Sequence, residues 1–161
     1  MNPQFNSFKK QIQHPIKYRL FMLSKLPMGF ISGLKIENLS AEQSAISVKF
    51  KWINQNPFRS IYFAVLSMAA ELSTGLLSFG QIYKRHPQVS MLVVKCEADF
   101  LKKATGKIIF TCNDGKKIED AIEQTLITGN GITIQVTSIG KNSNNEEVAK
   151  FLFIWSFKAK K

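Results

Sequence analysis

The sequence predicts an α+β fold in which an antiparallel sheet of about six strands wraps around one long central helix. The first observation is the stretch 59–79, where Glu71 is the only charged residue after Arg59. The second is that segments with a period of two lie on both sides of this stretch, two before it and four after it. A helix that is apolar on nearly all sides must be covered, so we expect the sheet to curl around it.

Residues 1–30 precede the sheet and are predicted to form an N-terminal helical extension. The helical part, 5–25, is broken at His14-Pro15, because proline lacks a backbone donor and restricts the residue before it. Residues 26–29 are expected to be a connection. The second helical piece carries a rough apolar face, made of Ile16, Leu20, Met22 and Leu23.

Six segments are predicted to be strands because apolar and polar residues alternate along them. They are residues 33–39, 46–52, 90–101, 107–112, 132–139 and 148–157. The long helix is expected to stop before Gly80, and a short amphipathic helix is expected over 118–126. The last strand is apolar on both faces, which is typical of a central strand or of a buried interface.

One domain spanning 1–161 is expected, since 161 residues can build one proper core and are too few for two. Lys and Arg number 22 against 11 Asp and Glu, which gives a formal net charge of +11. This charge is either a solvated basic surface or the footprint of a polyanionic partner, a nucleic acid or a phosphorylated small molecule.

The two cysteines, Cys96 and Cys112, each lie in an apolar strand-like run, where cysteine is often a small buried hydrophobe. Their spacing indicates neither a disulfide scaffold nor a CxxC zinc site, so we expect a reducing compartment. The start of the chain lacks the apolar core of a signal peptide, and no export is implied. The expected location is the cytoplasm.

Residues 60–79 are also long enough to span a bilayer, with one charge among 20 residues. Four Ser, one Thr and one Gly dilute the hydrophobicity of this stretch, and the chain has no second candidate span. A sheet wrapped around a buried helix explains the same pattern, so we expect no membrane span.

Glu71 lies near the middle of a predicted polar stripe on this helix. The stripe steps by three or four residues and consists of Ser60, Ala64, Ser67, Glu71, Thr74 and Ser78. Burying an unpaired carboxylate is costly, so the stripe should face solvent, a cleft or a partner subunit. From spacing alone, Glu71 could equally be a solvent-exposed residue or accept hydrogen bonds from a neighbouring strand.

The stretch 56–71 resembles the signature of the hotdog-fold acyl-CoA thioesterases of the phenylacetyl-CoA thioesterase type. That signature is an Asn, five residues, then His-Gly-Gly and an apolar helix, with an acid nine residues after the His. Here Asn56 stands six residues before Tyr62, and Glu71 stands nine residues after it. The segment FLKKATGKI, residues 100–108, is similar to a strand–turn–strand segment of the family. The resemblance covers roughly residues 36–157 and is greatest to a poorly characterised branch in which His-Gly-Gly is often absent.

Tyr62 replaces the His of the signature, and Phe63-Ala64 replaces Gly-Gly. In the family, a backbone N–H at the start of the helix helps to stabilise the thioester oxyanion, and glycine lets the substrate approach closely. Phe63 keeps this N–H but crowds the thioester. Glu71 for Asp is a milder change, because a Glu at this position also serves in related thioesterases. The helix over 118–126 is an insertion relative to the minimal fold.

The resemblance implies that Glu71 is the catalytic base or nucleophile and that Asn56 positions water or the carbonyl group. The alternative for Asn56 is a turn residue before Pro57. Tyr62 and Phe63 would border the thioester. Two further substrate-binding candidates, one turn either side of Glu71, are Ser67 and Thr74.

The phosphates of coenzyme A would need basic partners. Lys102, Lys103 and Lys107 cluster around the predicted turn at Thr105-Gly106, and Arg59 lies at the start of the helix. The alternative for each is a solvated surface charge.

Other constellations are missing from the sequence. His14 and His86 are both followed by proline and have no acidic or Cys partners at metal spacing. We find no GxSxG elbow, no phosphate loop at Gly106-Lys107 and no aromatic RNA-binding signature. Neither a metal nor a cofactor is therefore expected beyond the coenzyme A thioester as substrate.

The leading hypothesis is an acyl-CoA thioesterase with its site at a subunit interface. The resemblance implies a homodimer, with a tetramer as the larger assembly, and the two-faced last strand motivates an interface. The alternative is a non-catalytic hotdog protein that binds acyl groups or a fatty ligand, because His-Gly-Gly is missing. A basic nucleic-acid-binding module is the weakest hypothesis.

Overall fold

The computed structural model describes residues 2–160, so both ends of the predicted 1–161 domain, Met1 and Lys161, lie outside the described residues. The helices are α1 (Phe5–Ile12), α2 (Pro15–Lys25), α3 (Pro27–Ser32), η1 (Trp52–Asn54), α4 (Phe63–Ile82) and α5 (Gly115–Thr128). The strands are β1 (Lys35–Leu39), β2 (Ser44–Lys49), β3 (Val89–Phe100), β4 (Lys107–Cys112), β5 (Ile132–Lys141) and β6 (Glu147–Ala159).

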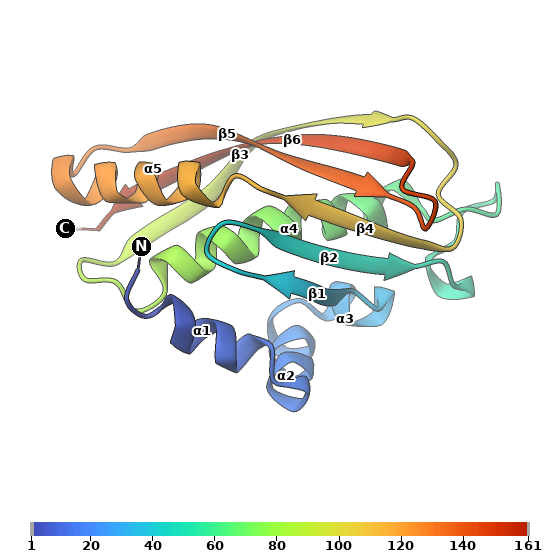
Figure 1. Ribbon diagram of the computed structural model, residues 1–161, viewed down its shortest axis with the longest axis horizontal. Helices are drawn as coiled ribbons and strands as arrows, with labels where there is room; N and C mark the ends of the chain where they lie inside the picture. The colour runs from blue at the N-terminus through green and yellow to red at the C-terminus, as the bar shows by residue number, and fades with distance from the viewer. Residues whose placement is uncertain (1, 161) are drawn as a thin grey trace.

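The six strands form one antiparallel sheet in the order β1-β2-β4-β5-β6-β3. Figure 1 shows this sheet curving over α4, as the alternating segments and the apolar helix predicted. The α+β fold class and the central helix are therefore confirmed. The expected strand 46–52 is shifted, because β2 begins at Ser44 and the chain turns into η1 at Trp52.

β6 is a central strand, between β5 and β3. Phe151, Phe153, Trp155 and Phe157 are buried, and all four lie on one face of the strand. The central position predicted for this strand is therefore confirmed, and Leu152 and Ile154 on its other face are half-buried. β3, in contrast, is an edge strand and is exposed along most of its length, so the expected burial of Cys96 is wrong while that of Cys112 is confirmed.

The central helix begins later and ends later than predicted. Residues 56–60 form a turn held by the Asn56 side chain, so α4 begins only at Phe63. It runs through Gly80 to Ile82, and the predicted stop at Gly80 is wrong. Gly80 is instead a packing position, since a Cβ there would lie 2.5 Å from the ring of Phe5.

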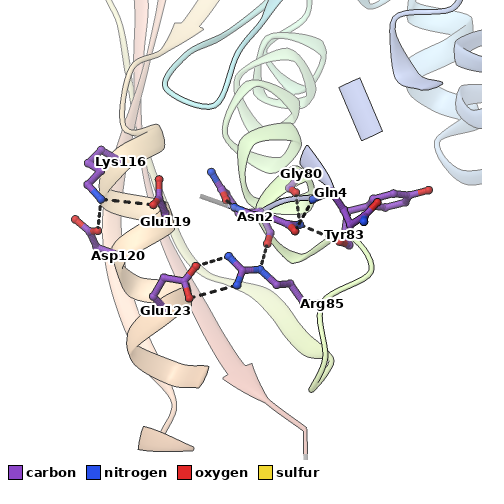
Figure 2. Close-up of polar contacts among 10 residues, drawn as sticks. Asn2, Gln4, Gly80, Tyr83, Arg85, Lys116, Glu119, Asp120 and Glu123 are labelled. Carbon is purple, nitrogen blue, oxygen red and sulfur yellow. Dashed lines mark hydrogen bonds and ion pairs between the residues drawn. The ribbon is translucent and has the colours of Figure 1, made fainter. Parts of the chain in front are cut away.

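The N-terminal helices are tied to the far end of α4. Figure 2 shows the Nδ2 of Asn2 donating to the carbonyl groups of Gly80 and Tyr83, at 2.9 and 2.8 Å. The backbone N–H of Asn2 also donates to Oε1 of Gln81 at 3.0 Å. Just beyond α4, Arg85 forms a two-pronged ion pair with Glu123 of α5 (Figure 2). These contacts fix both α1 and α5 relative to the central helix.

The predicted break at His14-Pro15 separates α1 from α2, as expected. The predicted connection at 26–29 is wrong, because Pro27 starts the short helix α3. The four residues of the predicted apolar face of α2 do not share one environment. Met22 is buried, whereas Ile16, Leu20 and Leu23 are exposed.

Among residues 2–160, α4 is the one helix long and apolar enough to cross a membrane, with a mean hydropathy of 1.4. However, 61% of that window is buried inside the fold. Burial in the sheet accounts for its composition, as the sequence indicated.

Candidate active site

Glu71 faces two apolar cavities between α4 and the N-terminal helices. The larger, of about 340 Å³, is lined by Phe21, Lys25, Leu26, Glu71, Leu72, Gly75, Leu76, Phe79 and Met91. The smaller, of about 250 Å³, is lined by Lys25, Leu26, Pro27, Met28, Gly29, Leu34, Met68, Glu71 and Leu72. Glu71 is the one carboxylate in either wall. Of solvent, a cleft and a partner subunit, which were expected to face the polar stripe, the cleft is the one found at Glu71.

The carboxylate folds back along its own helix. Its Oε1 lies 3.0 Å from the position that a Cβ on Gly75 would occupy, so glycine one turn later leaves the space it uses. Burial raises the pKa of Glu71, because the apolar walls disfavour the charged form. Lys25 lines the same cavities, but no ion pair joins it to Glu71 among the described residues. A carboxylic acid with a raised pKa in a cleft is a candidate functional group.

The predicted polar stripe fails at both ends. Ser60 lies before α4 and is buried. Thr74 and Ser78 are completely buried. The Thr74 hydroxyl donates to the main-chain carbonyl of Glu71 at 2.9 Å and accepts from the indole N–H of Trp155 at 2.9 Å. Thr74 thus bonds to the backbone of Glu71 rather than to its carboxylate, and it serves packing against β6. The stripe prediction is wrong for this half because the sheet covers α4 here.

Asn56 organises the turn that precedes α4. Its Oδ1 accepts from the backbone N–H groups of Phe58 and Ser60, at 2.9 and 3.2 Å, and from the Ser60 hydroxyl at 3.2 Å. Asn56 therefore acts as a turn residue, the alternative role that the sequence left open. Its Nδ2 has no hydrogen-bond partner among the described residues and remains a donor available to a ligand.

The start of α4 carries an exposed aromatic cluster. The ring of Phe63 lies edge-on to Tyr62 and to Phe100 of β3, with ring centroids 4.8 and 6.1 Å apart. Tyr62 provides no side-chain cap to the helix. Ser67, one turn into the helix, donates to the carbonyl of Phe63 at 3.0 Å. The first amides of α4 therefore lie beside aromatic rings, at a helix end that favours negative charge.

The basic candidates differ in their surroundings. Lys102 pairs with Glu146 at 2.5 Å, and Lys107 pairs with Glu37 at 2.7 Å. Lys103 and Arg59 are exposed and take part in no ion pair among the described residues. No group of three or more His, Cys, Asp or Glu residues that could hold a metal ion occurs among them either.

The structure does not bring all the candidates to one place within a single chain. Phe63 and Glu71 are eight residues apart on one helix, which corresponds to about 12 Å along its axis. Asn56, Tyr62 and Phe63 belong to the start of α4, whereas Glu71 lies near its middle. A base and an oxyanion donor acting on one thioester must both lie about 3 Å from the reacting atoms. One chain alone cannot meet this condition.

The cavity walls around Glu71 are the part that sequence reasoning missed. Phe21, Lys25 and Leu26 come from the end of α2, and Met91 comes from β3. The one available signal was the proline after Leu26, which turns the chain back toward α4. Nothing in the local pattern of α2 says which of its faces meets the cavity.

Comparison with known proteins places the chain in a family. The model of the family described as "Domain of unknown function (DUF4442)" matches residues 19–155. No curated protein matches the sequence.

Solved structures share the fold. One is a protein of unknown function from Pseudomonas aeruginosa described as a probable thioesterase, 18% identical, with a TM-score of 0.76 over 91% of this chain and 97% of that one. A thioesterase from Haemophilus influenzae is 12% identical, with a TM-score of 0.64 over 87% and 88% of the two chains. The PaaI protein from the phenylacetic acid degradation operon of Escherichia coli is 13% identical, with a TM-score of 0.63 over 87% and 88%. The sheet and helix described above are thus the hotdog fold that the resemblance implied.

Proposed function

Since the chain belongs to the family described as Domain of unknown function (DUF4442) and has the hotdog fold of proteins described as thioesterases, we propose that it hydrolyses an acyl-CoA thioester. The observation that carries the proposal is the position of Glu71, a single carboxylate set into apolar cavities at the middle of the central helix. The cavities supply room for part of an acyl chain, and the carboxylate supplies the base or nucleophile.

As a base, Glu71 takes a proton from water, and the resulting hydroxide attacks the thioester carbonyl carbon. The tetrahedral intermediate then expels the coenzyme A thiolate, which receives the proton from Glu71. As a nucleophile, Glu71 attacks the carbonyl itself, expels the thiolate and forms an anhydride that water cleaves. A raised pKa suits the first route, because a base works best when its pKa lies near the working pH.

The oxyanion is stabilised by the first amides of α4, at Phe63 and Ala64, which lie at the positive end of the helix dipole. Because these amides lie roughly 10–12 Å from Glu71 along the helix axis, the pair that acts on one substrate comes from two chains. Asn56, Tyr62 and Phe63 of one chain would then work with Glu71 of the other. This geometric gap supports the homodimer.

The sheet edge formed by β3 is the proposed dimer contact, replacing β6, which the fold buries in the sheet interior. β3 pairs with β6 on one side only, and it exposes Leu92 and Val94 at 66% and 57%. A long edge strand with exposed apolar side chains is a template for pairing with another chain. A Val94→Lys variant should shift the protein from dimer to monomer in light scattering, whereas Ile127→Lys, an exposed apolar position on α5, should not.

The phosphates of coenzyme A would contact Lys103 and Arg59, the two exposed basic candidates whose side chains are not held by a neighbouring carboxylate. Lys102 would first have to leave Glu146. Tyr62 and Phe63 would border the thioester, and Ser67 would contact substrate beside them.

One observation favours the second candidate function, non-catalytic binding of acyl groups. The Asn56 side-chain oxygen already accepts three hydrogen bonds, which leaves only its Nδ2 to orient water or a carbonyl group. The apolar cavities would serve a bound fatty ligand equally well.

A panel of acyl-CoA substrates of increasing chain length, with phenylacetyl-CoA included, separates the two functions when free thiol is measured. Hydrolysis that needs Glu71 supports the thioesterase. Tight displacement of a fluorescent fatty acid, with no thiol released from any substrate, supports the binding protein instead.

A further inference from the structure

The outer side of α2 is apolar although it is exposed. We call it the outer N-terminal surface. Its exposed apolar side chains are Ile16 (65%), Leu20 (61%) and Leu23 (55%). In Figure 1, α2 projects from the body of the molecule on the side away from α5. Exposed apolar side chains gathered in this way mark an interaction site, whereas scattered ones need no explanation.

The helix α2 shows how this surface is built. Met22 and Tyr18 lie on its inner side, where Met22 is buried and the Tyr18 hydroxyl donates to the carbonyl of Leu34 at 2.9 Å. Ile16, Leu20 and Leu23 follow the i, i+4, i+7 spacing on the opposite side. On a helix of 3.6 residues per turn, Lys17 and Arg19 fall on the two flanks of this stripe. The outward stripe is therefore bordered by positive charge.

The charge of this region has one sign. The first 36 residues contain no Asp or Glu, and the first acid of the chain is Glu37. They contain six basic residues, Lys9, Lys10, Lys17, Arg19, Lys25 and Lys35. An exposed apolar stripe with basic residues on its flanks is complementary to the boundary between acyl chains and anionic headgroups.

We propose that the outer N-terminal surface docks the protein on an anionic lipid bilayer. Ile16, Leu20 and Leu23 of α2 enter the boundary between headgroups and acyl chains, and the basic residues contact the anionic headgroups. The docking does not depend on thioester hydrolysis.

Charge decides between this partner and two others. A second copy of the chain docked through the same surface would bring two regions of like charge together, which disfavours association. A nucleic acid would suit the charge, but it is bound through basic contacts to phosphates and, in single strands, through aromatic stacking, and neither explains an exposed aliphatic stripe. An anionic bilayer satisfies both the apolar stripe and the basic flanks.

The surface also adjoins the cavities at Glu71. Lys25 and Leu26, at the end of α2, line both cavities. Docking would therefore bring the bilayer next to the part of the molecule that is shaped for an apolar chain.

Vesicle co-sedimentation tests the proposal with the full chain. We expect binding to vesicles of phosphatidylcholine mixed with phosphatidylserine, and little binding to phosphatidylcholine alone. Replacing Leu20 and Leu23 together by Asn leaves the net charge unchanged and should weaken binding by about tenfold or more, because the buried apolar area supplies the anchoring. The matched control is Ile127→Asn, which removes an apolar side chain that is 83% exposed on α5. It should bind like the unmodified protein.

Replacing Lys17 and Arg19 by Gln should also weaken binding, and added salt should mimic this change, because salt screens exposed charges. Equal binding to neutral and anionic vesicles would overturn the proposal. So would a Leu20 and Leu23 variant that sediments with vesicles like the unmodified protein. Light scattering on the same variant gives the last check, since a change in its oligomeric state would identify the surface as a contact between copies of the chain.

Discussion

Glu71 and Thr74 lie three residues apart on α4, on what the sequence presents as one polar stripe, yet they meet different surroundings. Glu71 faces apolar cavities bounded by the N-terminal helices. Thr74 is completely buried and bonds to Trp155 of β6. The periodicity of a helix thus tells which residues share a face, but not where the covering elements end. Here the sheet covers Thr74, whereas Glu71 faces the two cavities.

Removing the charge at Glu71 should have the largest effect. Glu71→Gln keeps the shape and removes the base, so kcat for the best acyl-CoA substrate should fall by about 10²–10⁴-fold, the usual contribution of general acid–base catalysis. Thiol release under saturating substrate measures it. A fall of less than twofold, with the variant folded, would remove Glu71 from the chemistry.

Breaking the buried contact of Thr74 should have the next largest effect. Thr74→Val removes the hydroxyl and leaves the Trp155 indole N–H without its acceptor in the core, which should cost about 1–3 kcal/mol of unfolding free energy. Activity per folded molecule should remain. Ser67→Ala is the matched control, because this hydroxyl also bonds to its own helix but at the exposed side, and its loss should change stability by about 0.5 kcal/mol or less. Equal losses in the two variants in urea titration would contradict the assignment.

Gly75 offers a finer test of how the carboxylate is held. A Cβ at this position lies 3.0 Å from Oε1 of Glu71, so Gly75→Ala should push the carboxylate out of its place. Alanine also favours the helix by about 1 kcal/mol, which offsets the crowding and keeps the protein folded. We expect about a tenfold lower kcat with little change in thermal stability. Gly131→Ala, where a Cβ would meet no atom within 4 Å, should leave kcat unaltered.

The same contrast explains how much the sequence could predict. The order of elements, the central helix and the break before α2 follow from local patterns, because period and proline act within a few residues. The sequence places the start of α4 too early, at about residue 59 instead of Phe63. The reason is that an Asn side chain can either hold a turn, as Asn56 does, or cap the start of a helix. The C-terminal half of the polar stripe and the inner face of α2 could not be assigned either. Both depend on how segments far apart in the chain come together, as in the hydrogen bond of Thr74 with Trp155 and the cavities that Leu26 and Glu71 both line.

The smallest expected effect concerns stability and pH, and it follows from the burial of Glu71. Its pKa is raised in the folded protein, so between the unfolded value and the folded value the native state binds more protons than the unfolded state. Stability therefore falls as pH rises through this window, and the penalty persists above it. Below the ordinary pKa of glutamate, both states are protonated and the penalty disappears.

Glu71→Gln should consequently be more stable than the unmodified protein at neutral pH and equally stable in acid below the ordinary glutamate pKa. Thermal unfolding of both proteins across this range measures the difference, which should grow as pH rises. Glu37→Gln provides the opposite control. Hydrogen bonds from Lys107 and Ser47 lower the pKa of Glu37, so its stabilising effect is present above the unfolded pKa and is lost as pH falls. A difference for Glu71→Gln that does not change with pH would show that the carboxylate is solvated, and it would remove the physical basis for treating Glu71 as a poised base.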